Sequence, residues 1–78
     1  MFKHCSIKEL AQVIDATWGN VYFGARPYLD AMHELENIDD NYYLDSGKSV
    51  VLYFLANAQT WRGQTAREVK AELKRRCK

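Results

Sequence analysis

Apolar residues recur with helical spacing near the start of the chain, at Ile7, Leu10, Ala11, Ile14 and Trp18. Side chains three and four positions apart share one face of a helix, so this pattern predicts an amphipathic helix from Ile7 to Trp18. Ser6 and Glu9 have the spacing of a capping box, in which each side chain accepts a hydrogen bond from the other residue's backbone amide. Gly19 is placed to end this helix in a left-handed conformation.

A second apolar stripe follows Pro27, at Leu29, Met32 and Leu35. Proline suits the first turn of a helix, so a second helix is predicted from Pro27 to about Glu36. Between the two helices, residues 21–23 favour a short extended piece. Turn-forming residues fill positions 37–47, which we therefore expect to be a loop.

The run from Val50 to Ala56 is apolar without interruption. Such a run fits either a buried strand or a buried helix, and its continuation with helix-favouring residues predicts a helix from about Lys48 to Gln59. Asp45 or Ser46 is placed to cap it. Because apolar residues lie nearly all round this helix, we expect it to be central and covered on most sides.

The last helix is predicted to be amphipathic and basic. Thr65 and Glu68 have capping-box spacing, and the apolar face that follows consists of Ala66, Val69, Leu73 and Cys77. One flank pairs Glu72 with Arg76 at the favourable spacing of four. The other flank carries no acid and is called the basic stripe: Arg67, Lys70, Lys74 and Lys78.

These elements predict an all-α fold, a compact bundle of three to four helices in one domain of residues 1–78. A content of 47% hydrophobic and 27% charged residues is typical of a folded globular chain. The aromatic residues expected in the core are Trp18, Phe23, Phe54 and Trp61. In the corner before the last helix, Trp61 is expected to pack on the first and third helices and Gly63 to permit the turn.

Charge is distributed unevenly, although the net charge of the chain is only +1. Residues 27–59 hold six acidic residues against one lysine, and residues 60–78 hold seven basic residues against two acidic ones. These segments either neutralise each other within the fold or steer different partners. No secretory leader or membrane-spanning stretch is recognisable, so we expect a cytoplasmic protein without membrane contact, with Cys5 and Cys77 reduced.

Short motifs give little support for catalysis or for a bound cofactor. Gly47-Lys48-Ser49 matches the end of a phosphate-binding loop, but Tyr42 stands where that motif needs its first glycine. Zinc sites usually draw on close ligand pairs, which are missing among His4, Cys5, His33 and Cys77. His33 follows Asp30 by three positions, a spacing that orients an imidazole, but no nucleophile accompanies them. We therefore expect a protein that is not an enzyme and has no cofactor or metal.

Two surfaces are candidates for binding a partner. Tyr42 and Tyr43, beside Asp39 and Asp40, predict an acidic and aromatic loop suited to a basic protein surface. In the alternative interpretation these tyrosines cover the small core. The basic stripe is the second candidate, and if the last two helices form a helix-turn-helix its partner would be nucleic acid. The predicted contact residues are Tyr42, Tyr43, Asp39, Asp40, Arg67, Lys70, Lys74 and Lys78.

Residues 54–63, followed by residues 66–74, resemble the end of short uncharacterised proteins of tailed bacteriophages and prophages. The Thr60-Trp61-Arg62-Gly63 corner is the more specific part of this resemblance, which covers the last third of the chain. It implies a protein made in the cytoplasm of an infected bacterium, where small phage proteins often bind and redirect a host protein. We therefore predict a non-catalytic protein-binding module, a modulator or inhibitor of a host protein, acting as a monomer or homodimer. A small nucleic-acid-binding protein is the alternative.

Overall fold

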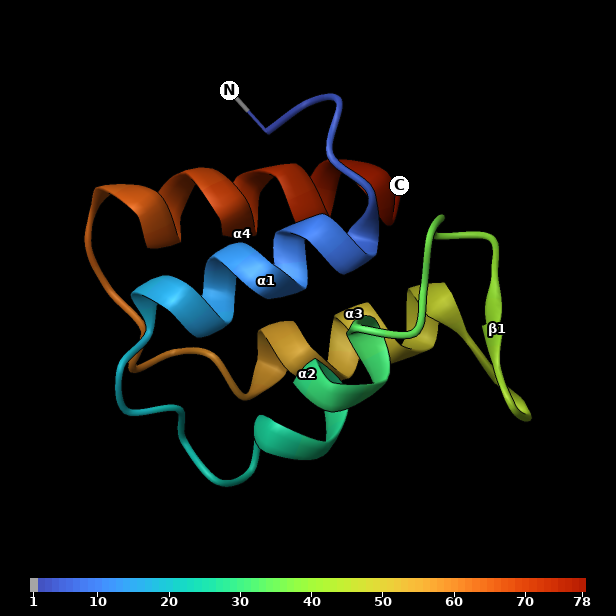
Figure 1. Ribbon diagram of the computed structural model, residues 1–78, viewed down its shortest axis with the longest axis horizontal. Coiled ribbons are helices and arrows are strands. Elements are labelled where there is room, and N and C mark those ends of the chain that lie inside the picture. Colours follow the sequence, from blue (N-terminus) through green and yellow to red (C-terminus); the bar gives the residue numbers. More distant parts are fainter. Residues whose placement is uncertain (1) are drawn as a thin grey trace.

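The computed structural model describes residues 2–78, and over that range it contains four helices and one short antiparallel β-hairpin (Figure 1). The elements are α1 (Ile7–Thr17), α2 (Arg26–Met32), β1 (Asn41–Tyr42), β2 (Asp45–Ser46), α3 (Gly47–Ala56) and α4 (Gln64–Arg76). α1 lies beside α4, α2 packs on α3, and contacts of α1 with α2 and of α3 with α4 close the bundle. The predicted helical bundle is confirmed. The all-α class is wrong in one respect, because a hairpin stands where only a loop was expected.

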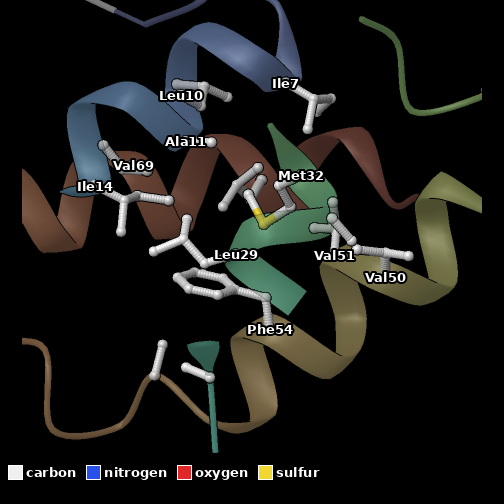
Figure 2. Packing of buried hydrophobic residues seen from close by; sticks show 14 of the residues in the cluster. Ile7, Leu10, Ala11, Ile14, Leu29, Met32, Val50, Val51, Phe54 and Val69 are labelled. Atoms are coloured by element: carbon white, nitrogen blue, oxygen red, sulfur yellow. The ribbon is translucent and has the colours of Figure 1, made fainter. Parts of the chain in front are cut away.

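The core lies where the four helices meet. Figure 2 shows side chains of α1 directed toward those of α2 and α3. The fully buried large side chains are Ile7, Leu10, Ile14, Leu29, Met32, Leu35, Val51, Phe54, Val69 and Leu73. These include the apolar stripes read from the sequence, and each such side chain contributes about 1.5–3 kcal/mol when it leaves water.

α1 begins as its sequence predicts and ends differently. The amide of Glu9 donates to the Ser6 hydroxyl at 3.0 Å, and the Glu9 carboxylate accepts from the Ser6 amide at 2.8 Å, so the capping box is confirmed. At the other end, the amide of Trp18 donates to the Ile14 carbonyl. Gly63 is the one glycine with positive φ among residues 2–78, so the predicted left-handed Gly19 is wrong.

α2 ends at Met32, four residues before the predicted end at Glu36. The reason lies in α1, whose first amides have no partner within their own helix. The amides of Ile7 and Lys8 donate to the carbonyls of Glu36 and Leu35 at 2.9 and 2.7 Å. The chain therefore leaves the helix so that these carbonyls reach the start of α1, and Leu35 is still buried.

Three of the four aromatic residues assigned to the core are buried there. Trp18 stacks on Trp61 with ring centroids 5.7 Å apart, and it meets Phe54 edge-on at 6.2 Å. Phe23 is 80% exposed, so its assignment to the core was wrong. It lies on the turn before α2, where its ring contacts Tyr22, and residues 21–23 form no strand. Trp61 covers the ring of Trp18, and Phe23 stays outside the bundle.

α3 is shorter and more exposed than predicted. The Ser46 hydroxyl accepts from the Ser49 amide at 3.1 Å, so Ser46 is the cap, and the helix ends at Ala56 instead of Gln59. Leu52 and Tyr53 are exposed, Tyr53 to 57%. The expectation of a helix covered on most sides is therefore wrong, because α2, α4 and the hairpin contact α3 and still leave Leu52 and Tyr53 exposed.

α4 begins at Gln64, with Gly63 as its cap at φ 111°. The predicted capping box is wrong, because no side chain caps this helix and the Glu68 carboxylate accepts from the Gln64 side chain instead. The predicted pairing of Glu72 with Arg76 is confirmed. Hydrogen bonds from Arg75 lower the pKa of Glu72 to about 2, against the opposing effect of partial burial and with further help from Arg76.

Candidate functional site

Four of the five tyrosines gather around α2, α3 and the hairpin. The rings of Tyr28 on α2 and Tyr53 on α3 stack with centroids 5.4 Å apart and an interplanar angle of 26°. In the hairpin, Tyr42 packs edge-on against Tyr43 at 4.7 Å. Aromatic residues with a polar end are enriched where proteins bind one another. Their convergence therefore marks this side of the molecule as a candidate contact surface.

A cleft of about 420 Å³ lies among these side chains and is called the tyrosine cleft. Its lining includes Pro27, Tyr28, Tyr42, Asp45, Val50 and Tyr53. Val50 is buried in the core and contributes apolar lining, and three tyrosines contribute aromatic lining. Asp45 adds one exposed carboxylate, so the cleft combines apolar area with a single negative charge.

The two residues at the turn of the hairpin, Tyr43 and Leu44, are called the hairpin tip. Tyr43 is 87% exposed, and Leu44 has no protection from solvent. Figure 1 shows the hairpin projecting from the side of the bundle near the start of α3. Two neighbouring large side chains that bury so little area add little to the stability of the fold, and their exposure favours a partner that covers them.

The backbone at the tip is strained. Tyr43 has φ 56°, and among residues 2–78 it is the one residue other than glycine with positive φ. For a bulky residue this conformation costs about 1–2 kcal/mol, and tight hairpin turns ordinarily carry glycine or asparagine there. Strain of this kind tends to occur at functional positions. Tyr43 thus combines strain with exposure.

The four residues predicted for the acidic loop have different roles. The Asp40 carboxylate accepts from the amides of Glu36 and Asn37 at 3.1 and 3.0 Å, so it holds the loop in shape. Asp39 is exposed, and Tyr42 is half-buried against the core. The interpretation of the tyrosines as a cover for the core fits Tyr42, while Tyr43 is free to contact a partner.

Sequence reasoning missed Tyr28, Tyr53 and Asp45 as members of this surface. Tyr28 and Tyr53 are separated by most of the acidic segment, and only the packing of α2 on α3 brings their rings together. One signal was present in the sequence. Tyr53 lies off the wide apolar face that Val50 and Phe54 share, so a helical wheel alone places it toward solvent.

The base of the hairpin is fixed by Gly47. Its amide donates to the Asp40 carbonyl at 2.6 Å. A Cβ at this position would lie 2.7 Å from the carbonyl oxygen of Ile38 and 2.8 Å from that of Asp40. The glycine of the Gly47-Lys48-Ser49 sequence therefore serves close backbone packing.

The basic stripe is only partly free. The Lys70 ammonium donates to the Trp61 carbonyl and lies 5.9 Å from the centroid of the Trp61 ring. Desolvation, together with the nearby charges of Lys74 and Arg62, lowers the pKa of Lys70. Arg67 donates to the Gln64 side chain at 2.7 Å. Lys74 and Lys78 are exposed, so the structure leaves fewer cations for a partner than the spacing suggested.

A charged cluster joins α1 to α2. The guanidinium of Arg26 donates to both carboxylate oxygens of Asp15 at 3.0 and 3.2 Å, and the His33 ring contacts the same carboxylate. Partial burial opposes ionisation of Asp15, but hydrogen bonds from His33 and Arg26 outweigh it and lower the pKa of Asp15. The predicted orientation of His33 by Asp30 is wrong, because Asp30 binds Arg26 instead.

The residues considered as metal ligands are dispersed. Within residues 2–78 no three His, Cys, Asp or Glu side chains lie close enough to hold a metal ion. Cys5 and Cys77 are free thiols, and burial raises the pKa of Cys77 although Lys48 opposes this effect. No helix in the same range is long and apolar enough to cross a membrane.

The residues that are most specific to the predicted phage resemblance have packing roles in the structure. Trp61 is buried, and Gly63 takes the positive φ that the turn into α4 needs. Comparison with family models, with curated proteins and with solved structures finds no match to this chain, so the resemblance stays a prediction.

Proposed function

We propose that this chain is a small non-catalytic protein-binding module whose contact surface is the tyrosine cleft together with the hairpin tip. The observation that carries the proposal is the hairpin tip itself. Tyr43 is strained and 87% exposed, and it stands beside a cleft walled by three further tyrosines. Tyr43 costs stability and buries little area within its own fold. Contact with a partner molecule is the best explanation for such a side chain.

The partner we propose is a protein with a basic surface. The segment that builds the cleft and the tip, residues 27–59, has six acidic residues and one lysine. Complementary charge increases the association rate and excludes acidic competitors. In line with the predicted phage resemblance, the partner would be a protein of the bacterial host, bound in the cytoplasm and modulated or inhibited by the contact.

A single substitution separates this role from a structural one. Asparagine tolerates positive φ, so Tyr43→Asn relieves strain while it loses the contact with Tyr42, and we expect stability within about 0.5 kcal/mol of the original chain. The matched control is Phe23→Asn, which removes another exposed aromatic ring, on the turn before α2. Affinity capture from nuclease-treated bacterial lysate then compares the three proteins.

We expect one stoichiometric protein to be captured by the original chain and by Phe23→Asn, and to be lost with Tyr43→Asn. Equal capture by all three proteins would refute the proposed surface. If a parallel capture from untreated lysate recovers only nucleic acid, and nuclease abolishes this recovery, the second candidate is favoured.

That second candidate, nucleic-acid binding through the basic stripe, has one supporting observation. Lys74 on α4 and Lys78 just beyond its end are exposed, and within residues 2–78 no carboxylate pairs with either of them. However, Lys70 donates to the Trp61 carbonyl, and Arg67 donates to the Gln64 side chain. Few free cations imply weak phosphate binding.

A further inference from the structure

The geometry of the tyrosine cleft indicates what kind of segment it binds. Tyr28 and Tyr53 are stacked, with only 26° between their planes, so their rings do not enclose a pocket. Both rings line the cleft, and Val50 and Tyr42 line it with them. Such a cleft of parallel aromatic rings accepts a ligand that lies along it, and it offers no closed cage for a single ammonium group.

Proline rings suit this surface. A segment in the polyproline II conformation has its backbone already extended, so it loses little conformational entropy on binding, and aromatic-lined grooves are its usual receptors. With about 420 Å³, the tyrosine cleft has room for a short stretch of extended chain. A helix would need a longer apolar groove for its successive turns.

Charge sets a second requirement. Asp45 is the one carboxylate among the residues that line the cleft, and it is exposed in β2, just before α3. Two other carboxylates of the acidic segment are engaged: Asp40 holds the loop, and Asp30 binds Arg26. Asp45 is thus free to bind a Lys or Arg side chain next to the prolines.

A second copy of this chain fits the cleft less well. In a two-fold symmetric contact the same patch meets itself, so the two acidic segments would approach each other. A stable dimer also needs about 800 Å² from each partner, contributed by about 20–30 residues, whereas the cleft and the tip involve far fewer. Both arguments favour a short basic segment of another protein.

We infer that the tyrosine cleft binds a proline-rich segment that carries a Lys or Arg beside its prolines. This inference rests on the proposed protein-binding function and specifies its ligand. Prolines pack on the rings of Tyr28 and Tyr53, and the basic side chain pairs with Asp45. The hairpin tip lies next to the cleft and covers the segment from one end.

The probe is a fluorescein-labelled peptide, Ala-Pro-Pro-Leu-Pro-Pro-Arg, titrated with the full chain and followed by fluorescence anisotropy. Two control peptides replace every proline by alanine or the arginine by glutamate. The protein variants are Tyr53→Ala and Asp45→Asn, with Leu52→Ala as the matched control, because Leu52 is exposed on the same helix outside the cleft. Thermal unfolding checks that each variant is folded.

We expect saturable binding of the proline peptide, at least about tenfold weaker with Tyr53→Ala and unchanged with Leu52→Ala. Asp45→Asn should weaken it about threefold, and the glutamate peptide should bind worse than the arginine peptide. Equal binding of the alanine peptide, or equal loss with Leu52→Ala, would overturn the inference.

The test also separates the inference from the function on which it rests. If no peptide binds but Tyr43→Asn still abolishes capture of a protein, the ligand chemistry is wrong and the proposed function stands. If no peptide binds and capture is also insensitive to Tyr43→Asn, both the inferred ligand and the proposed function are wrong.

Discussion

Replacing Gly47 by alanine tests how the hairpin is attached to the bundle. The new Cβ would lie 2.7 and 2.8 Å from two backbone oxygens, on Ile38 and Asp40, where ordinary contact requires at least 3.4 Å. Because neither oxygen belongs to a flexible side chain, the loop must shift by several tenths of an ångström. Overpacking of this kind costs about 1–3 kcal/mol, and the better helix propensity of alanine recovers less than about 1 kcal/mol at the first helical residue.

A domain of this size has a stability on the order of 5 kcal/mol, so the loss is a large fraction of the total. At about 4–8 °C per kcal/mol, we expect the midpoint of thermal unfolding to fall by about 5–20 °C, measured by far-ultraviolet circular dichroism. Gly19→Ala is the control, because a Cβ there meets no atom within 4 Å, and its stability should stay within about 0.5 kcal/mol. A Gly47→Ala protein as stable as this control would refute the packing of the loop on α3.

Three further predictions follow from the structure. Gly63→Ala places a side chain at φ 111° and should destabilise the protein by about 1–3 kcal/mol in urea unfolding, although no atom obstructs the Cβ; an unchanged midpoint would contradict the strain argument. The pKa of Glu72 is about 2 when folded, below its usual 4.5, so its contribution to stability is full above about pH 5 and is lost as the pH falls toward 2. The stability difference between the original chain and Glu72→Gln should therefore be largest at neutral pH and shrink in acid, and a constant difference across a pH series of urea titrations would contradict this. Because Lys70 is engaged, duplex DNA should contact three cations of the basic stripe at most. The logarithm of the association constant for DNA should then fall with the logarithm of the salt concentration at a slope no steeper than about −3. A slope steeper than about −5 would favour nucleic-acid binding as the function.

The local parts of the fold were predictable from the sequence. Periodicity and the Ser6–Glu9 spacing determine the start and the buried face of α1, because both depend on residues within a few positions of each other. The end of α2 was not predictable in this way. It depends on hydrogen bonds from Ile7 and Lys8 to carbonyls about thirty positions away, which no local pattern contains.

The candidate surface was predictable in part. Tyr42 and Tyr43 were recognisable as loop tyrosines, but their different roles follow from burial, and the strain at Tyr43 follows from a turn only two residues long. Tyr28 and Tyr53 join them through the packing of α2 on α3. A surface assembled from α2, the hairpin and α3 leaves no single sequence motif to find.

The most direct test of the central claim is site-specific photo-crosslinking. A benzoylphenylalanine placed at Tyr43, in the hairpin tip, is compared with one at Phe23, because both positions are exposed aromatics in the original chain. In bacterial lysate, we predict one discrete protein adduct from position 43 and none from position 23. Adducts of the same pattern from both positions, or from position 23 alone, would contradict the claim that the hairpin tip and the tyrosine cleft form the contact surface.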